Sequence, residues 1–331
     1  MSTPNIEEVA AAAGVHRSTV SRAFSRPEAV KRETRDHVLR VAASLGYTMS
    51  PFAQALRTKV STLVPLVVPD ITNPYFAELT KAMTAAAGER GYQLVLCVTQ
   101  GDADATARYL DAMQAMYAPF AVIAPYAQVD PAEFEFHGFG RRLVVIDRVE
   151  PGDDTSTVTV DSATGIELAL DHLFELGHTS IAYVSGIAGT HTAADRREAY
   201  RKLAEKHGMT PLELGSSVIG VEAGERAAEE LVNLRERPTA VVAGNDQIAF
   251  GLISALGSRG MSVPGDVSVV GFDGLPLGAS SNPPLTSVQQ PIGEMGRIAI
   301  HLAQQAANGG PIEHVVLQPQ LLVRSSTGPA R

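Results

Sequence analysis

From residue 60 onward, short apolar runs alternate with longer stretches in which apolar positions recur at helical spacing. The apolar runs, which predict strands, are 61–68, 92–98, 120–124, 142–147, 180–184, 239–243 and 267–271. The stretches between them, which predict helices, are 74–89, 103–117, 162–176, 193–207, 222–234, 246–257 and 291–307. Nearly continuous apolar strands separated by helices indicate parallel sheets with helices on both faces. We therefore expect an α/β fold for this part of the chain.

The first sixty residues have a helical pattern and no strand-like run. Asn5 followed by Glu8 forms a capping box, and apolar positions then recur at helical spacing as far as Gly14. A second helix is expected from about Arg17 to Phe24. Its buried face carries Val20, Ala23 and Phe24, and its other face carries Arg17, Ser18, Ser21 and Arg22.

A third helix is expected over residues 32–45, where it ends at Gly46. Its predicted buried residues are Val38, Val41, Ala42 and Leu45. Two short helices around a glycine turn, with a third behind them, indicate a helix-turn-helix. Such a domain places its exposed second helix in the major groove of DNA.

A fourth, very short helix is expected after this domain. Ser50 and Pro51 form a helix start, but only about eight residues follow before the pattern becomes strand-like. A helix of this length is marginal by itself in water. We therefore expect DNA or a partner subunit to hold it.

Charge separates the two regions further. Residues 1–60 contain nine Lys and Arg against five Asp and Glu, a balance of +4, whereas the rest contain 18 against 31, a balance of −13. A basic patch confined to one end of an acidic chain is typical of a nucleic-acid-binding module. The alternative is a helical subdomain whose arginines are only solvated.

Several classes of protein and site are disfavoured. No apolar run is long enough to span a bilayer, and the N-terminus lacks the pattern of a secretion signal, so we expect a cytoplasmic protein. Cys97 is the single cysteine, and no HxH or HExxH spacing occurs, so neither a disulfide nor a metal site is expected. No GxSxG or P-loop motif occurs, and no cofactor is expected.

Polar side chains follow the predicted strands of the larger region, where open α/β sheets bind ligands. They are Asp70, Asn73, Tyr75 and Phe76 after the first strand, then Asp147 with Arg148, Ser185, Asn245 with Asp246, and Asp273. Carboxylates, amides and an arginine beside aromatic rings suit a small polyhydroxylated ligand. Asn73 and Ser185 could instead only cap the following helices, and Asp246 is interpreted as a helix cap.

The chain resembles the lac repressor/galactose repressor family of transcription factors over nearly its full length. The segment "AGVHRSTVSRAF…TRDHVLRVAASLGY" carries the helix-turn-helix pattern of that family, "ALRT" its hinge, and "NPYF" a loop of its sugar-binding core. In this chain His16 and Lys31 stand where the family usually has a capping residue. The resemblance implies residues 1–58 as the DNA-binding domain, with a hinge helix at about 50–58, and residues 60–331 as the ligand-binding and dimerisation core.

The resemblance also implies roles for individual residues of the DNA-binding domain. Arg17, Ser18 and Arg22 would read base edges, and Thr19 and Ser21 would contact phosphates. The hinge helix would dock in the minor groove with Leu56 wedged into a base step, and Ala53 and Arg57 beside it.

In the core, the resemblance implies a site that binds a small effector between two subdomains. The N-subdomain would comprise about 60–160 and 289–320, and the C-subdomain about 161–288 and 321–331. The implied effector-binding residues are Asn73, Tyr75, Phe76, Asp147, Thr190, Thr192, Arg196, Asn245, Asp273 and Gln289.

The leading hypothesis is a sequence-specific DNA-binding regulator, functioning as a repressor, whose homodimer binds a pseudo-palindromic double-stranded operator. Its effector would be a sugar, an inositol or a nucleoside, and either induction or corepression remains open. A sugar-binding transport protein would leave residues 1–58 without a purpose. An enzyme with Asp147 or Asp273 as a base lacks a nucleophile–base pair.

Overall fold

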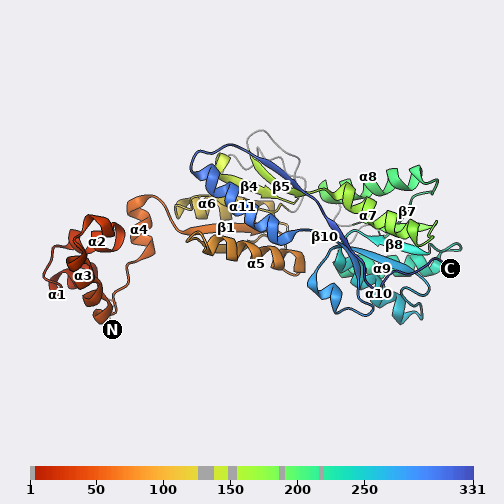
Figure 1. The fold of residues 1–331 in the computed structure, drawn as a ribbon, viewed down its shortest axis with the longest axis horizontal. Helices are drawn as coiled ribbons and strands as arrows, with labels where there is room; N and C mark the ends of the chain where they lie inside the picture. The colour runs from red at the N-terminus through yellow and green to blue at the C-terminus, as the bar shows by residue number, and fades with distance from the viewer. Residues whose placement is uncertain (1–3, 126–137, 148–154, 186–190, 216–219) are drawn as a thin grey trace. The chain divides into compact units, whose positions relative to one another are not determined.

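The computed structural model describes residues 4–125, 138–147, 155–185, 191–215 and 220–331. The chain forms two compact units, Met1–Thr62 and Leu63–Arg331. We refer to them as the N-terminal unit and the core (Figure 1). Within the described parts of the chain, no helix is long and apolar enough to cross a membrane.

The N-terminal unit consists of helices, as its sequence predicts. They are α1 (Ile6–Ala12), α2 (Arg17–Ser25), the 3-10 turn η1 (Pro27–Ala29), α3 (Arg32–Leu45) and α4 (Pro51–Thr58). The capping box is confirmed, because Asn5 Oδ1 accepts from the Glu8 amide at 3.0 Å and Glu8 Oε2 accepts from the Asn5 amide at 2.9 Å. Val9, Val20 and Val38 meet in a small core that joins α1, α2 and α3.

The end of α3 corrects one prediction. Gly46 ends the helix in the left-handed conformation, with φ of 68°, as expected. Leu45, predicted to be buried, is instead 40% exposed. The chain turns at Gly46 and packs Tyr47 against the small core, with its ring centroid 5.7 Å from that of Phe24. Tyr47, and not Leu45, thus packs against the small core of the N-terminal unit.

The core contains two six-stranded sheets. The first sheet has the order β11-β5-β4-β3-β1-β2, and all its strands are parallel. Its strands are β1 (Leu63–Val68), β2 (Gln93–Val98), β3 (Ala121–Ile123), β4 (Leu143–Ile146), β5 (Ser156–Val160) and β11 (His314–Leu317).

The second sheet has the order β12-β10-β9-β8-β6-β7, and only β12 is antiparallel to its neighbour. Its strands are β6 (Ile181–Val184), β7 (Leu212–Leu214), β8 (Ala240–Ala243), β9 (Ser268–Asp273), β10 (Thr286–Gln289) and β12 (Gln320–Leu322). The predicted strands are all present, and the fold class is confirmed.

Helices cover the sheets, and their predicted order is confirmed. They are α5 (Pro74–Gly88), α6 (Ala103–Ala115), α7 (Ser162–Glu175), α8 (His191–Lys206), α9 (Gly220–Asn233), α10 (Asp246–Ser258) and α11 (Ile292–Ala307), with short 3-10 turns η3 (Gly140–Arg142) and η4 (Pro276–Ala279). α5 and α11 lie side by side over the first sheet (Figure 1). α9 and α10 pack so closely that a Cβ on Gly224 would lie 2.1 Å from the Ile248 carbonyl oxygen.

Three connections in the described residues carry the chain between the two sheets. They lead from β5 to α7, from β10 to α11 and from β11 to β12. A fourth link is made by one side chain: Leu275 follows β9 of the second sheet, yet it is fully buried in the hydrophobic cluster of the first. The carboxyl ends of β9 and β10 therefore lie beside the links between the two halves of the core.

Candidate DNA-binding and effector sites

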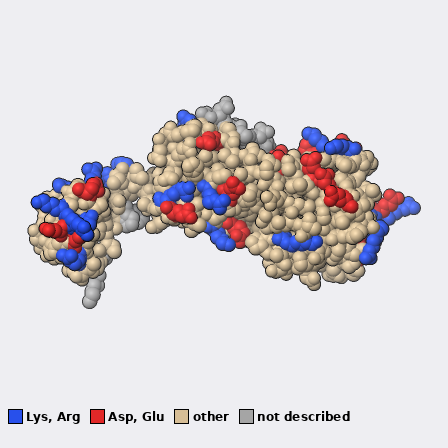
Figure 2. All heavy atoms as spheres, in the orientation of Figure 1, with Lys and Arg blue, Asp and Glu red and all other residues tan. Residues whose placement is uncertain are grey.

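Helix α2 presents a polar face at the surface of the N-terminal unit. Arg17 and Arg22 are exposed, whereas Val20 and Ala23 on the opposite face are buried. Figure 2 shows Lys and Arg side chains on the visible face of this unit. A short helix with buried apolar residues and exposed arginines can enter a DNA groove without unfolding the unit that carries it.

His16 replaces the usual cap of α2 with an imidazole that also caps. Its Nδ1 accepts from the Ser18 amide at 3.3 Å and lies 2.9 Å from Ser18 Oγ. Arg22 Nη2 donates to the same hydroxyl at 3.4 Å. The side chains of His16, Ser18 and Arg22 are thus linked by hydrogen bonds along α2. Lys31, by contrast, makes no side-chain cap for α3.

The predicted short helix is present as α4. Leu56 on this helix is 63% exposed. Arg57 Nη1 donates to Ser21 Oγ of α2 at 3.4 Å. The side chain of Ala53 lies outside the described residues. The dependence of α4 on DNA or on a partner subunit stays a prediction.

In the core, a cavity of about 470 Å³ lies at the carboxyl ends of β1 and β8. Three of the predicted effector residues, Asn73, Phe76 and Asn245, line it. Its other lining residues are Pro69, Asp70, Thr72, Gln100, Gly220, Val221 and Gln247. Gln247 Nε2 donates to the Thr72 carbonyl oxygen at 3.3 Å, so groups that follow strands of both sheets meet at this cavity.

Asn73 and Asn245 have a second role as helix caps. Asn73 Oδ1 accepts from the Tyr75 amide at 3.0 Å at the start of α5. Asn245 Oδ1 accepts from the Ile248 amide at 2.9 Å at the start of α10. The cap holds each carboxamide in place at the cavity, so capping and ligand binding are compatible roles here.

Arg196 is brought to the same edge of the second sheet and is buried. Its Nη1 donates to the Gly244 carbonyl oxygen at 2.8 Å, and its Nε donates to Ser162 Oγ at 3.3 Å. Its guanidinium lies 3.6 Å from the centroid of the Phe272 ring, a cation–π contact. Phe272 is fully buried, so this aromatic ring supports the arginine and is not open to a ligand.

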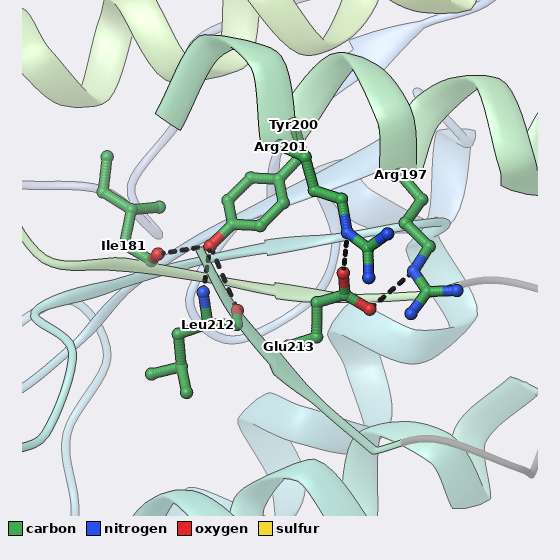
Figure 3. A network of polar contacts seen from close by, with 6 residues as sticks. All are labelled: Ile181, Arg197, Tyr200, Arg201, Leu212 and Glu213. Atoms are coloured by element: carbon green, nitrogen blue, oxygen red, sulfur yellow. Dashed lines mark hydrogen bonds and ion pairs between the residues drawn. The ribbon is translucent and has the colours of Figure 1, made fainter. Parts of the chain in front are cut away.

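The helix that carries Arg196 is fastened to the edge of the second sheet (Figure 3). Glu213 of β7 accepts from Arg197 Nε and Arg201 Nε, each at 2.6 Å. On the buried side, Tyr200 Oη accepts from the Leu212 amide and donates to the Ile181 carbonyl oxygen, each at 2.9 Å. Helix α8 therefore holds Arg196 in a fixed position.

Asp246 corrects a second prediction. Asn245 caps α10, so the interpretation of Asp246 as the cap is wrong. Asp246 is fully buried, and its carboxylate accepts from Ser287 Oγ at 2.5 Å and from the Leu275 amide at 2.7 Å. It therefore joins α10 to β10 and to the loop after β9. Burial raises the pKa of Asp246 to about 6, although these hydrogen bonds oppose the shift.

Asp273 ends β9 and is only 3% exposed. Its Oδ1 accepts from Gln290 Nε2 at 2.8 Å. Burial raises the pKa of Asp273 to about 8, and the carboxylates of Asp246 and Asp147 add to the shift, whereas Arg196 opposes it. Asp147 is similarly buried, at the end of β4 in the first sheet.

The other predicted effector residues lie in different settings. Tyr75 is buried in the cluster of the first sheet, where its hydroxyl lies 3.8 Å from Met295 Sδ, and it does not line the cavity. Gln289 is half-buried at the end of β10, against the backbone of Gly274. Thr192 lies in the first turn of α8. Thr190 and Arg148 lie outside the described residues.

Sequence reasoning missed Gln290, Gln247 and Gln100. Gln290 is the amide that bonds Asp273, and the other two line the cavity. Gln247 stands two residues after the cap Asn245, which is a signal that could have been used. Gln290 follows a strand of only four residues that is too short and polar to be recognised. In the described ranges, no group of three metal-binding side chains comes together.

Known proteins resemble both units. A family model described as bacterial regulatory proteins, lacI family, matches residues 5–50, and one described as a periplasmic binding protein-like domain matches residues 170–327. The HTH-type transcriptional regulator DegA of Bacillus subtilis (strain 168) is 32% identical over 332 residues, which cover 98% of each chain.

Two solved structures extend the likeness. The lac repressor dimer bound to operator and the anti-inducer ONPF has a TM-score of 0.88 at 24% identity, over 99% of this chain and 100% of that one, which is a likeness of fold. A LacI family transcriptional regulator from Enterococcus faecium with bound ribose has a TM-score of 0.73 at 25% identity, over 81% of this chain and 100% of that one.

Proposed function

Because the chain belongs to the lacI family of bacterial regulatory proteins, we propose that it binds a pseudo-palindromic operator as a homodimer and represses transcription under control of a small effector. Like its relatives, the chain is a transcriptional regulator and not an enzyme.

The arrangement of side chains on α2 is the observation that best supports DNA binding. Arg17 and Arg22 are exposed on the face opposite the buried Val20 and Ala23, and Ser18 lies beside Arg22. Arginine pairs bidentately with guanine, and serine can donate to or accept from a base edge. Thr19 and Ser21 on the same helix are proposed to contact phosphates on the resemblance alone. In α4, the exposed Leu56 is suited to wedge into a base step, with Ala53 and Arg57 beside it.

The effector proposed is a sugar, an inositol or a nucleoside that binds between the two sheets of the core. Asn73, Phe76 and Asn245 at the cavity, together with Asp147, Arg196 and Asp273 at neighbouring strand ends, offer hydrogen bonds to several hydroxyl groups. A structure of similar fold contains bound ribose, which supports this class of ligand. Thr190, Thr192, Tyr75 and Gln289 stay in the proposed site on the resemblance alone.

The first experiment is a selection of random DNA duplexes by the purified full chain at several salt concentrations. Enrichment of a pseudo-palindrome, with affinity that falls steeply as salt rises, is the expected result, because each neutralised phosphate releases counterions. The selection is repeated with a pool of sugars, inositols and nucleosides. If no sequence is enriched with or without the pool, the proposed DNA recognition is wrong.

The effector class is tested by thermal unfolding of the full chain with each member of the pool. A ligand at one hundred times its Kd stabilises the folded state by about 2.7 kcal/mol. Arg196→Met should abolish this stabilisation, whereas Arg226→Met on α9 should retain it, since Arg226 is exposed and pairs with Glu222 at the surface. Stabilisation that survives Arg196→Met would contradict the proposed site.

A further inference from the structure

Asp273 and Gln290 form a buried pair whose hydrogen bonding is incomplete when Asp273 is ionised. Gln290 Nε2 donates to Asp273 Oδ1 at 2.8 Å. The second oxygen of each group, Asp273 Oδ2 and Gln290 Oε1, is sealed from solvent and has no hydrogen-bond partner among the described residues. Two unpaired acceptors in a buried site cost free energy, so folded proteins rarely contain such a pair.

A proton on Asp273 Oδ2 would give both oxygen atoms a hydrogen bond. A neutral carboxylic acid has one O–H donor, and a primary amide has both a donor and an acceptor. The two groups can therefore form a ring of two hydrogen bonds, from the amide N–H to Oδ1 and from Oδ2–H to Oε1. We propose that Asp273 is a neutral carboxylic acid in the ligand-free protein and that Gln290 holds its proton in this acid–amide pair.

The charges around the pair support the neutral form. Asp246 of α10 and Asp147 after β4 are acidic groups that oppose a further negative charge, and both raise the pKa of Asp273. Arg196 of α8 is the cation that favours ionisation, and the hydrogen bond from Gln290 Nε2 also lowers the pKa of Asp273. The Arg196 guanidinium is already engaged by the Gly244 carbonyl oxygen, Ser162 and the Phe272 ring. Burial, the largest cause of the raised pKa, is therefore not offset by a dedicated counter-ion.

The position of the pair gives it a consequence for the whole core. Two residues after Asp273, Leu275 inserts into the hydrophobic cluster of the first sheet. Immediately after Gln290, Pro291 begins the connection to α11, which packs on that sheet. The acid–amide pair thus joins two of the links between the halves of the core, and Gln290 is a positioning residue for Asp273.

The consequence for the effector rests on the proposed function. Asp273 Oδ2 is sealed from solvent, so an effector has to open the acid–amide pair to reach it. An effector hydroxyl that then donates to Oδ2 takes the place of the acid proton, which is released to solvent. The carboxylate formed repels Gln290 Oε1 and loosens the pair at these links. Effector affinity should therefore rise with pH, by at most about tenfold per pH unit, up to the pKa of Asp273.

The pair itself is tested without any effector, in the full chain. A double-mutant cycle combines Asp273→Ala with Gln290→Ala and measures the unfolding equilibrium constant at about pH 7 and about pH 9. The expected coupling is about fivefold at the lower pH, the equivalent of one net hydrogen bond, and it should be largely lost at the higher pH. An ionised Asp273 bonded by the amide would give the opposite trend, with coupling that is constant or grows with pH, and would overturn the proposal.

Two control cycles separate the proton from the hydrogen bonds. In Asp273→Asn the side chain offers an N–H donor and a carbonyl acceptor without a titratable proton, so its coupling to Gln290 should not change with pH. Gln305 Nε2 and Glu313 Oε1 form a partly buried amide–carboxylate pair at 2.9 Å elsewhere in the core. Coupling in that cycle should not fall as pH rises.

An infrared measurement keeps the proposal falsifiable if the alanine variants do not fold. Wild-type protein at about pH 7 should have a carbonyl band of a protonated carboxyl group that disappears near pH 9 and is missing in Asp273→Asn. Absence of the band from the wild-type chain at the lower pH would overturn the acid–amide pair. Because no effector is added, neither result depends on the proposed effector class.

Discussion

The two units hold their candidate binding groups in opposite surroundings. In the N-terminal unit, the side chain of Arg17 is 69% exposed and Leu56 is 63% exposed. In the core, Arg196 is 7% exposed and Asp273 is 3% exposed, and both have hydrogen-bond partners within the protein. A helix that docks on DNA can leave its side chains in water until it binds, whereas a small ligand has to be enclosed.

In the N-terminal unit, a substitution at a binding residue should therefore change binding and leave stability nearly unchanged. In the core, it should change both. An exposed arginine stabilises the folded chain little, so its removal should affect binding almost alone. A buried, partnered carboxyl or guanidinium is part of the packed interior, and its removal affects folding as well.

The largest effect is expected in the tight packing of the core. Gly224→Ala would place a Cβ 2.1 Å from the Ile248 carbonyl oxygen and 2.4 Å from the Leu252 amide nitrogen. Because both atoms are backbone, α9 and α10 must separate, and we expect a loss of about 3 kcal/mol or more in the free energy of unfolding. Chemical denaturation of the full chain measures it.

Gly257 provides the matched control on α10. A Cβ there has no heavy atom within 4 Å, so Gly257→Ala should instead stabilise the chain by about 0.5–1 kcal/mol. Equal destabilisation by both substitutions would mean that the close packing of α9 on α10 is not the cause of the loss in Gly224→Ala.

The second prediction concerns α2. Arg22→Ala should weaken binding to the selected operator by about 1–3 kcal/mol, the range of a good base contact, and should relax the preference at one position of each half-site. The free energy of unfolding should change by less than about 0.5 kcal/mol, since Arg22 is exposed. Electrophoretic mobility shift and thermal unfolding measure the two effects.

Arg226→Ala is the control for Arg22→Ala. Arg226 is an exposed arginine of α9 that pairs with Glu222. Its removal should leave operator binding unchanged. A large loss of stability in Arg22→Ala would contradict the idea that binding residues of the N-terminal unit contribute little to its stability.

The third prediction uses the raised pKa of Asp273. The folded chain keeps the Asp273 proton at pH values where the unfolded chain has lost it, so this residue favours folding at low pH and this contribution is lost as pH rises towards about 8. Between about pH 6 and about pH 8, wild type should lose up to about 1.4 kcal/mol per pH unit relative to Asp273→Asn. Thermal unfolding of both proteins across this range gives the difference. A difference that stays constant with pH would show that Asp273 is ionised throughout.

The smallest effect is expected at the cap of α2. His16→Ala removes the side chain that accepts from the Ser18 amide and should cost about 1 kcal/mol of stability. His16→Ser restores a cap oxygen and should recover most of that loss, which hydrogen exchange of the α2 amides can measure. A negligible cost of His16→Ala would mean that the imidazole does not cap α2 in solution.

How much of the site was predictable depends on the distance along the chain between interacting groups. The capping box joins residues three apart, and the cap at Asn73 acts on Tyr75, so both are readable from a few letters. Strand ends that carry Asp147, Asn245 and Asp273 were also predicted, because apolar runs locate the strands. The roles proposed for these residues await measurement.

The features that the sequence did not predict depend on residues that are far apart in the chain. β5, β7, β10, β11 and β12 were not predicted, since they are short or contain polar residues and owe their conformation to neighbours far away in the sequence. β11 pairs with β5, for example, through His314 and Thr157. Gln290 was missed for the same reason: its partner Asp273 is 17 residues away and meets it only when β9 and β10 lie side by side.

Local periodicity and caps a few residues long were enough to predict the helix-turn-helix, the order of the longer strands and helices in the core and the polar residues at the strand ends. No local pattern showed that Asp246 bonds Ser287 and Leu275, that Tyr75 lies inside the hydrophobic cluster of the first sheet, or that Asp273 meets an amide. These contacts arise where two sheets and their connections come together, and burial there changes the chemistry of a carboxyl group that the sequence shows only as an aspartate.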